Sequence, residues 1–221
     1  MKDNFAQYLL KKNKENYDLI AEDFSSTRSS LWPELQQFSS WVEEGDRILD
    51  IGCGNGRLLN LFSDKDVSYI GLDSSSRLVK LAQQDHPGRE FIVGDFLEVT
   101  FPSDTFDKAF AIAFLHHIPS EVMRLNILAE ARRILKPEGI LFLTVWTPAK
   151  AVLSPLFQKS KILKSRDIIR PWGKQTDLYC HFFKPKEIIH LTQKAGLSIV
   201  QHGELGEKAV QKNFYLLAQK I

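Results

Sequence analysis

Residues 47–57, RILDIGCGNGR, constrain the fold of this chain more than any other stretch. Ile48, Leu49 and Ile51 form a short apolar run that is typical of a buried parallel strand. Three glycines follow at alternate positions, and leucines at helical spacing come next. Glycines let the backbone turn sharply beside a bound molecule, and a helix start offers unpaired N–H groups. The run predicts a strand, a turn and a helix start that hold a ligand; the alternative is a glycine-rich turn without one.

The glycine spacing and one carboxylate indicate which ligand this turn holds. A dinucleotide site spaces its glycines G-x-G-x-x-G and binds a pyrophosphate at the helix start. Here Gly52, Gly54 and Gly56 are spaced G-x-G-x-G, and Asp50 precedes them. A carboxylate repels a phosphate and favours a cation, and S-adenosylmethionine (SAM) carries an ammonium, a sulfonium and no phosphate. The run resembles the first motif of class I SAM-dependent methyltransferases, whose methionine end it is expected to hold.

Length and composition indicate one domain spanning residues 1–221, with enough apolar residues, 43%, for a sizeable core. The sequence contains no run of 18 apolar residues, so no membrane span is predicted. The N-terminus is polar and charged, which is not typical of a signal peptide. Cys53 and Cys180 are far apart in sequence and fit no metal pattern. We therefore expect free thiols, no metal site and a cytoplasmic location.

Strand and helix patterns alternate along the chain. Strands after the first are expected at residues 67–72, 91–93, 106–114, 140–146, 197–201 and 214–218. Helices are expected at residues 1–24, 31–42, 74–85, 120–135 and 184–195, and a tight turn at 136–139. The alternation predicts an α/β fold with a doubly wound parallel sheet. The resemblance implies a Rossmann-like, seven-stranded, mostly parallel sheet whose last strand is antiparallel. Residues 1–44 would form an N-terminal helical cap and residues 147–183 a basic insert.

Polar side chains recur at the carboxyl ends of the expected strands, where ligands of such sheets lie. Asp73, about 20 positions beyond the glycines, is expected to accept both ribose hydroxyls. Asp95 and Phe96 are expected to hold an adenine, one at its amino group and the other on its face. The expected cofactor-binding residues are Asp50, Gly52, Gly54, Asn55, Asp73, Ser74, Asp95, Phe96 and Ala113.

Charge is distributed unevenly along the chain. The net charge is +2, but residues 150–186 hold nine Lys or Arg against two Asp. A basic segment on an acidic body predicts a polyanion site; the alternative is a solvated segment whose lysines aid solubility. The residues expected to meet phosphates, with salt-sensitive affinity and little sequence choice, are Lys159, Lys161, Lys164, Arg166, Arg170 and Lys174.

Three stretches resemble the methyltransferases that esterify 5-carboxymethyluridine at the tRNA wobble position. Residues 21–35, AEDFSSTRSSLWPEL, are similar to the family's Phe-Ser-x-Thr-Arg run and its following Trp-Pro. Residues 111–118 carry the His pair, with Val-Trp at 145–146. Residues 166–172, RDIIRPW, and 179–183, YCHFF, are similar to the family's Pro-Trp and Tyr-Tyr-His runs.

The resemblance implies SAM as methyl donor, S-adenosylhomocysteine as product and tRNA as substrate. Eukaryotic relatives work with a small zinc-binding activator protein. The chain departs from the family's pattern at Cys180, where a second tyrosine is usual, and at Leu178, where an arginine is frequent; both are expected near the acceptor pocket. The rival functions are a small-molecule O-, N- or C-methyltransferase with the basic insert as a lid, and a SAM-binding regulatory subunit without catalysis.

The acceptor chemistry suggests two catalytic residues, Arg28 and His116. A carboxylate acceptor is ionised at neutral pH, so its esterification needs a positioning cation and no general base. Arg28 is the candidate, because a guanidinium binds a carboxylate through two parallel hydrogen bonds; the alternative is that it binds the SAM carboxylate or a helix end. His116 would be the base for a neutral acceptor, and otherwise would hydrogen-bond the acceptor or the base edge. His117 is expected to face the core or the helix behind it.

Aromatic residues are expected to complete the acceptor site. Trp146 would stack on the uracil ring, as unstacked RNA bases are commonly read; the alternative is a core tryptophan. Trp172 and Tyr179 have the same two interpretations, and His181 matches the family's Tyr-Tyr-His run. The expected substrate-binding residues are Arg28, Trp146, Trp172, Tyr179 and His181.

Overall fold

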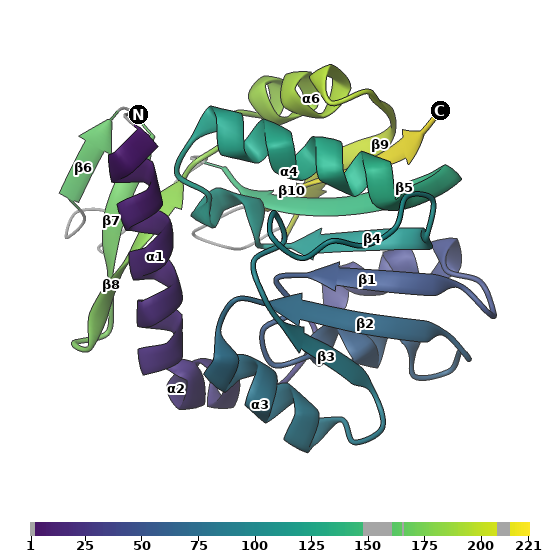
Figure 1. The fold of residues 1–221 in the computed structure, drawn as a ribbon, viewed down its shortest axis with the longest axis horizontal. Helices are drawn as coiled ribbons and strands as arrows, with labels where there is room; N and C mark the ends of the chain where they lie inside the picture. Colours follow the sequence, from purple (N-terminus) through teal and green to yellow (C-terminus); the bar gives the residue numbers. More distant parts are fainter. Residues whose placement is uncertain (1–2, 148–160, 165, 207–212) are drawn as a thin grey trace.

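The computed structural model describes residues 3–147, 161–164, 166–206 and 213–221, which form two sheets and the helices around them (Figure 1). The larger sheet has the strand order β3-β2-β1-β4-β5-β10-β9. Its strands are β1 (Arg47–Ile51), β2 (Ser68–Asp73), β3 (Glu90–Val93), β4 (Phe106–Ile112), β5 (Leu135–Trp146), β9 (Leu197–Leu205) and β10 (Asn213–Lys220). Strands β3, β2, β1, β4 and β5 are parallel, and β10 runs antiparallel to both β5 and β9. The predicted α/β sheet, mostly parallel with an antiparallel last strand, is confirmed.

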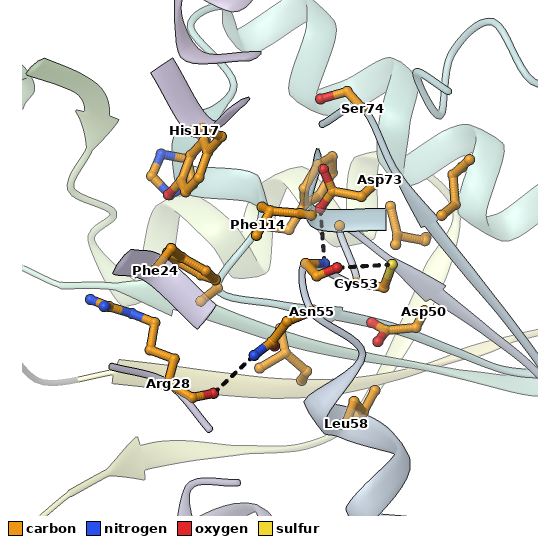
Figure 2. Close-up of a pocket in the computed structure, with 18 of the residues that line it drawn as sticks. Phe24, Arg28, Asp50, Cys53, Asn55, Leu58, Asp73, Ser74, Phe114 and His117 are labelled. Atoms are coloured by element: carbon orange, nitrogen blue, oxygen red, sulfur yellow. Dashed lines mark hydrogen bonds between the residues drawn. The ribbon is translucent and has the colours of Figure 1, made fainter. Parts of the chain in front are cut away.

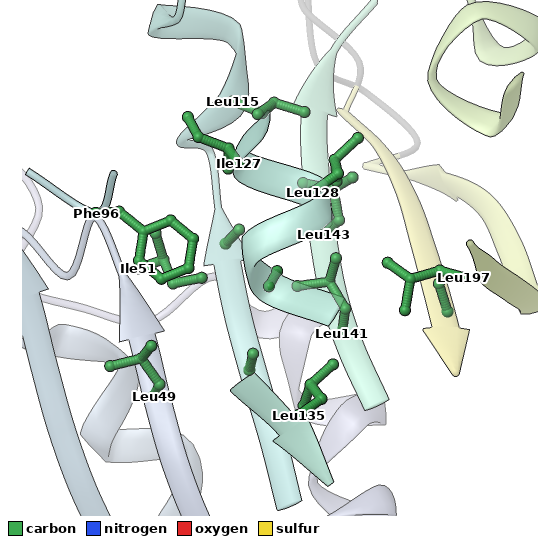
Figure 3. Close-up of a cluster of buried hydrophobic side chains, with 14 of the residues drawn as sticks. Leu49, Ile51, Phe96, Leu115, Ile127, Leu128, Leu135, Leu141, Leu143 and Leu197 are labelled. Carbon is green, nitrogen blue, oxygen red and sulfur yellow. The ribbon is translucent and has the colours of Figure 1, made fainter. Parts of the chain in front are cut away.

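Successive side chains of a strand point to opposite faces of the sheet, and here both faces carry an apolar core. Leu141 and Leu143 of β5 pack against Ile127 and Leu128 on one face (Figure 3), while Phe142 packs on the other. The helices of the first face are α4 (Glu121–Ile134) and α6 (Pro185–Lys194). The second face is covered by α3 (Ser76–Asp85) and by two 3₁₀ helices, η1 (Pro33–Trp41) and η2 (Arg57–Phe62). Two covered faces explain why the parallel strands are almost continuously apolar.

The helix expected at residues 31–42 is present as the 3₁₀ helix η1. Its polar side chains bond to backbone carbonyls three residues earlier. Gln37 Nε2 donates to Glu34 O at 2.6 Å, and Ser39 Oγ donates to Gln36 O at 2.9 Å. Such bonds compete with the α-helical ladder. The helix expected after the glycines is also a 3₁₀ helix, η2, and it starts beside Gly56 in the left-handed region.

Several boundaries also differ from the expectation. The expected helix at residues 1–24 is two helices, α1 (Asp3–Leu19) and α2 (Ala21–Ser26), separated at Ile20. Residues 136–139 are not a separate turn but lie within β5, where the register shifts from Phe106↔Leu135 to Lys108↔Ile140. The extra residues bulge out of the ladder, with Glu138 at φ 66°.

The described part of the basic insert is a small antiparallel sheet, which the sequence analysis did not predict. Its strands are β6 (Lys161–Lys164), β7 (Asp167–Trp172) and β8 (Thr176–His181). Helix α1 lies along β8 (Figure 1), and Asn13 bonds both backbone groups of Tyr179, at 3.0 and 2.8 Å. The small sheet is thereby attached to α1. None of the described helices is long and apolar enough to cross a membrane.

Candidate cofactor and acceptor site

A cavity of about 420 Å³ lies where β1, β2 and β4 end, and α1, α2 and the small sheet contribute to its walls. All the predicted cofactor-binding residues line it. They converge because the carboxyl ends of parallel strands meet at one edge of a sheet. The predicted acceptor residues Arg28, His116, Trp146 and Trp172 line the same cavity.

The glycine loop follows β1 and is held against the end of β2. Gly52 has a φ of 74°, and a Cβ at this position would lie 2.5 Å from the Phe114 ring. Gly52 N–H donates to Leu72 O at 2.7 Å, and Gly54 N–H donates to Asp73 Oδ2 at 2.9 Å (Figure 2). Glycine is therefore needed both for the left-handed backbone and for the close approach of Phe114.

Two carboxylates flank this loop, Asp50 buried and Asp73 half-buried. Asp50 is 2% exposed and accepts a hydrogen bond from Tyr69 Oη at 2.7 Å. Burial raises the pKa of Asp50 to about 7, although the Tyr69 hydrogen bond acts in the opposite direction. Burial also raises the pKa of Asp73, against the N–H groups of Ser75 and Gly54 that favour its charged form. A bound cation would stabilise both carboxylates in their ionised form.

The remaining predicted cofactor residues continue the cavity beyond β3 and β4. Asp95 Oδ1 accepts the Leu97 N–H at 2.9 Å. Phe96 is buried and also belongs to the hydrophobic core, so its ring has a structural role in addition to any ligand contact. Ala113 has a φ of 54°, and its N–H donates to Thr144 Oγ1 at 2.8 Å.

This donor set fits SAM. Asp50, Asp73 and Asp95 place three carboxylates around one cavity, which suits a ligand with cationic groups and a ribose diol. The two oxygens of Asp73 each accept one backbone N–H, and each keeps a lone pair for a hydroxyl. Ser74 lies beside Asp73 (Figure 2).

Arg28 also lines the cavity. Its guanidinium carbon is 4.2 Å from the centre of the Trp172 ring and 4.8 Å from that of Phe24. Its Nη1 donates to Thr27 Oγ1 at 2.8 Å, and within the described part of the chain it forms no ion pair. Arg28 is therefore a cation held by aromatic rings and available to an anion.

The stack of rings and guanidinium groups continues from Trp172 to His116. Arg170 lies 5.5 Å from the Trp172 ring and 4.7 Å from the Trp146 ring. The Trp146 ring in turn stacks on the His116 ring, with centroids 4.0 Å apart. Both tryptophans border the cavity, but part of each ring already contacts a neighbour.

The two histidines differ in their partners. His116 is fully buried, and neither ring nitrogen has a hydrogen-bond partner among the described residues. Burial lowers the pKa of His116 well below its usual value, so its ring is neutral at pH 7. His117 bonds the Tyr17 hydroxyl at 2.8 Å and Tyr179 O at 3.0 Å, and burial lowers its pKa to about 4. Tyr17 belongs to α1, so His117 contacts this helix, and it also lines the cavity.

Tyr179 and His181 do not line the cavity, contrary to the prediction. Tyr179 Oη donates to Asp167 Oδ1 at 2.5 Å. His181 bonds Asp167 Oδ1 at 2.8 Å and Glu187 Oε1 at 2.9 Å. Arg124 of α4 bonds the Tyr179 hydroxyl at 3.1 Å. This buried polar network connects the small sheet to α4 and α6, and its bonds occupy the polar atoms expected to meet substrate.

The two departures from the family pattern also lie outside the cavity lining. Leu178 and Cys180 are fully buried and pack in an apolar cluster with Ile20 and Ile168. They nevertheless lie near the cavity, directly behind its wall, because the cavity residues Phe24, Trp146 and Trp172 pack against this cluster. Both belong to the core between the small sheet and the N-terminal helices.

The basic residues of the insert have different environments. Lys161 and Lys174 are exposed on the small sheet and its turn. Arg166 pairs with Glu187 at 3.0 Å, and Arg170 lies between the two tryptophans, so neither is a freely solvated cation. The predictions for Lys159 and for the side chain of Lys164 fall outside the described residues.

The cavity lining also includes residues that the sequence did not single out as site residues, among them the polar residues Lys14, Tyr17 and Arg57. Arg57 had a usable signal, since it directly follows the last glycine of the loop. Lys14 and Tyr17 had none, because they reach the cavity through the packing of α1 against the small sheet.

The strand order, the glycine loop after β1 and the acidic residues after β2 and β3 define a class I SAM-dependent methyltransferase. Residues 49–143 match the family model described as a methyltransferase domain. The chain belongs to the tRNA (carboxymethyluridine(34)-5-O)-methyltransferase family: a relative of that name from Schizosaccharomyces pombe is 30% identical, over 92% of this chain and 94% of the relative.

A relative of the same name from Arabidopsis thaliana is 38% identical over 59% of this chain, and that match spans 31% of the relative. The chain thus spans about a third of the plant protein and nearly all of the yeast one. Among solved structures, a methyltransferase in complex with the Haloferax volcanii Trm112 methyltransferase activator has a TM-score of 0.73. The two chains are 20% identical, with 94% of this chain and 97% of that one covered, so this likeness concerns the fold.

Proposed function

We propose that this chain transfers the methyl group of SAM to the carboxylate of 5-carboxymethyluridine at the wobble position of tRNA. The family assignment supports the substrate class. The observation that carries the proposal is Arg28, a guanidinium without an ion-pair partner among the described residues, held over Phe24 and Trp172 at the cavity wall. A planar guanidinium suits a carboxylate acceptor.

The charged residues of the cavity suggest that one part binds the methyl donor and another part binds the acceptor. In the donor part, Asp50 would bind the ammonium of SAM, Asp73 the ribose hydroxyls, and Asp95 with Phe96 the adenine. The bound cofactor supplies an electrophilic methyl group. Arg28 would hold the acceptor carboxylate in line with it, and such alignment is the main contribution of an enzyme to this reaction.

His116 is suited to a neutral hydrogen-bonding role. Its pKa lies well below the usual value because the ring is buried, which makes it a weak general base at pH 7. A carboxylate acceptor needs no base, whereas a hydroxyl or an ammonium group does. We infer that His116 hydrogen-bonds the acceptor nucleotide. This reading favours esterification over the small-molecule O- or N-methyltransferase.

The acceptor is proposed to be presented by tRNA, with Lys161 and Lys174 contacting phosphates through salt-sensitive bonds. An activator protein is proposed as a partner, because the Haloferax volcanii neighbour was solved in complex with one. A cytoplasmic location is proposed from the chemistry of Cys53 and Cys180, both of them free and buried.

Mass spectrometry of tRNA nucleosides from cells with and without the gene tests this function. Loss of the gene should remove the methyl ester of 5-carboxymethyluridine and cause the free acid to accumulate. A plasmid copy should restore the ester, and an Arg28→Ala copy should not. Unchanged nucleosides, together with turnover on a small acceptor, would instead support the small-molecule enzyme.

A further inference from the structure

We propose that Arg57 binds the carboxylate of the methionine end of SAM, which leaves Arg28 for the acceptor. The inference rests on the proposed use of SAM and goes beyond it by assigning the two arginines of the cavity to different ligands. Arg57 begins η2, directly after Gly56 of the glycine loop, and lines the cavity. Its guanidinium lies 5.2 Å from the centre of the Trp32 ring.

The surroundings of Arg57 suit a cation that binds an anionic ligand. It is half-buried, and in the described ranges no carboxylate lies within ion-pair distance of it. Removing a guanidinium from water without a partner is costly, so a partner is expected when the site is filled. Trp32 restricts the orientation of the group before that partner arrives.

Proximity to Asp50 distinguishes Arg57 from Arg28. The ammonium and the carboxylate of SAM are attached to the same carbon atom, so their protein partners must lie near each other. Burial lowers the pKa of Arg57, and Asp50 is the next influence on it and acts in the opposite direction. Arg57 likewise opposes the burial that raises the pKa of Asp50. Asp50 directly precedes Ile51 and the glycine loop, Arg57 directly follows it, and both line the cavity without forming an ion pair, as expected of groups that flank a zwitterion.

Arg28 has different surroundings. Burial lowers its pKa, and Arg57 and Arg170 lower it further. Among the described residues, no carboxylate lies within ion-pair distance of Arg28. Figure 2 shows its guanidinium beside Phe24, on the other side of Asn55 from Asp50. Phe24 and Trp172 hold it there at 4.8 and 4.2 Å. This arrangement places Arg28 on the acceptor wall.

Lys14 is the other cation that lines the cavity, and it fits the carboxylate less well. It is exposed on α1, so its ammonium is solvated and mobile. Arg57, in contrast, is fixed to the segment that carries the methionine-binding glycines.

Decarboxylated SAM, which keeps the ammonium and sulfonium but lacks the carboxylate, is the probe that tests this assignment. Calorimetric dissociation constants for SAM and for decarboxylated SAM would be measured with the full chain, with Arg57→Met and with Arg28→Met. The unaltered chain should prefer SAM by about 10- to 100-fold, the usual strength of hydrogen bonds to charged groups. Arg57→Met should reduce the preference to less than about threefold and leave the affinity for decarboxylated SAM unchanged. Arg28→Met should keep the preference.

Two results would overturn the assignment. If Arg57→Met weakened both ligands equally, Arg57 would have only a structural role; if Arg28→Met abolished the preference, Arg28 would be the carboxylate ligand. Failure of the proposed function is distinguishable, because it would appear as absent methyl transfer to tRNA by the unaltered chain while the SAM preference persisted.

Discussion

The side-chain amide of Asn55 connects the glycine loop to the backbone of Arg28. Asn55 Nδ2 donates to Arg28 O at 3.2 Å (Figure 2) and to Ser25 Oγ at 3.1 Å. The orientation of the amide follows from chemistry, since the Arg28 carbonyl can only accept. The glycine loop and the segment that carries Arg28 are therefore joined by one side chain, although Asn55 and Arg28 are 27 residues apart.

Replacing Asn55 with aspartate should weaken the acceptor site more than the donor site. The change keeps the shape but removes two donors and sets a carboxylate against the Arg28 carbonyl. We expect the KM for tRNA to rise about tenfold, and the KM for SAM to change by less than about threefold. Asn60→Asp, which adds the same charge on the exposed side of η2, is the control. An equal rise in both KM values would contradict the link to Arg28.

Arg28→Lys should impair catalysis while it preserves the charge. Lysine lacks the planar fork and the stacking surface that Trp172 and Phe24 contact. We expect kcat/KM for tRNA to fall about 30-fold, with an unchanged dissociation constant for SAM. Arg77→Lys, at an exposed arginine 3.5 Å from Glu22, should have no effect. Equal activity of Arg28→Lys and the unaltered chain would exclude a bidentate role.

SAM affinity should increase as the pH rises from about 5.5 to 7.5, below the usual pKa of an α-amino group. The reason is the pKa of Asp50, which burial raises to about 7: below that pH the carboxyl is protonated and neutral, and above it the carboxylate attracts the ammonium. Calorimetry across this range measures the effect. With Asp50→Asn, the affinity for SAM should not change across this pH range.

Tyr69→Phe provides a second check on Asp50. The Tyr69 hydroxyl donates to Asp50 at 2.7 Å and favours the charged carboxylate. Without it, the pKa of Asp50 should rise further, and the gain in SAM affinity should move to higher pH. If SAM affinity rose at the same pH in Tyr69→Phe and in the unaltered chain, a group other than Asp50 would be responsible for the pH dependence.

Asp167→Asn should lower the free energy of unfolding, with an effect that depends on pH. Burial alone would raise the pKa of Asp167, but hydrogen bonds from His181 and Tyr179 and the charge of Arg124 lower it to about 2. Because this pKa is below its value in the unfolded chain, ionised Asp167 stabilises the fold above about pH 4, and this contribution is lost as the pH falls towards 2.

Denaturant unfolding of the unaltered chain and of Asp167→Asn measures the difference between their free energies of unfolding. We expect the variant to be less stable by about 2 kcal/mol at pH 7, and this difference to become smaller by pH 3. Asp104→Asn is the matched control, since Asp104 forms an exposed pair with Lys220 and should contribute less than about 1 kcal/mol. A loss that stayed constant between pH 7 and pH 3 would contradict the lowered pKa.

The residues proposed to bind the methyl donor could be placed at the cavity from sequence, because their signals are local. The glycine loop and the acids at strand ends are placed by adjacent strands, and Asp50, Asp73 and Asp95 all reach the cavity. The doubly wound, mostly parallel sheet follows from the alternation of strands and helices, whereas the order of its strands does not. Local patterns therefore determine the sheet and the residues at its edge.

The acceptor half depends on contacts between distant segments, which local patterns do not reveal. The small sheet is formed by short strands, one of them containing Pro171, a residue that rarely indicates a strand. Whether Tyr179 and His181 face the cavity is decided by Asp167 and Glu187, which bind them. Family resemblance named the right segment but not the direction of these side chains.

The most direct test of the central claim uses the full chain, an activator protein, SAM with a radiolabelled methyl group and tRNA that carries 5-carboxymethyluridine. An ester is cleaved by mild alkali, whereas N-, C- and ether-linked methyl groups are not. We predict that label enters this tRNA and that mild alkali releases it as methanol. Label that resists alkali, or no label in tRNA with the activator present, would contradict carboxyl methylation.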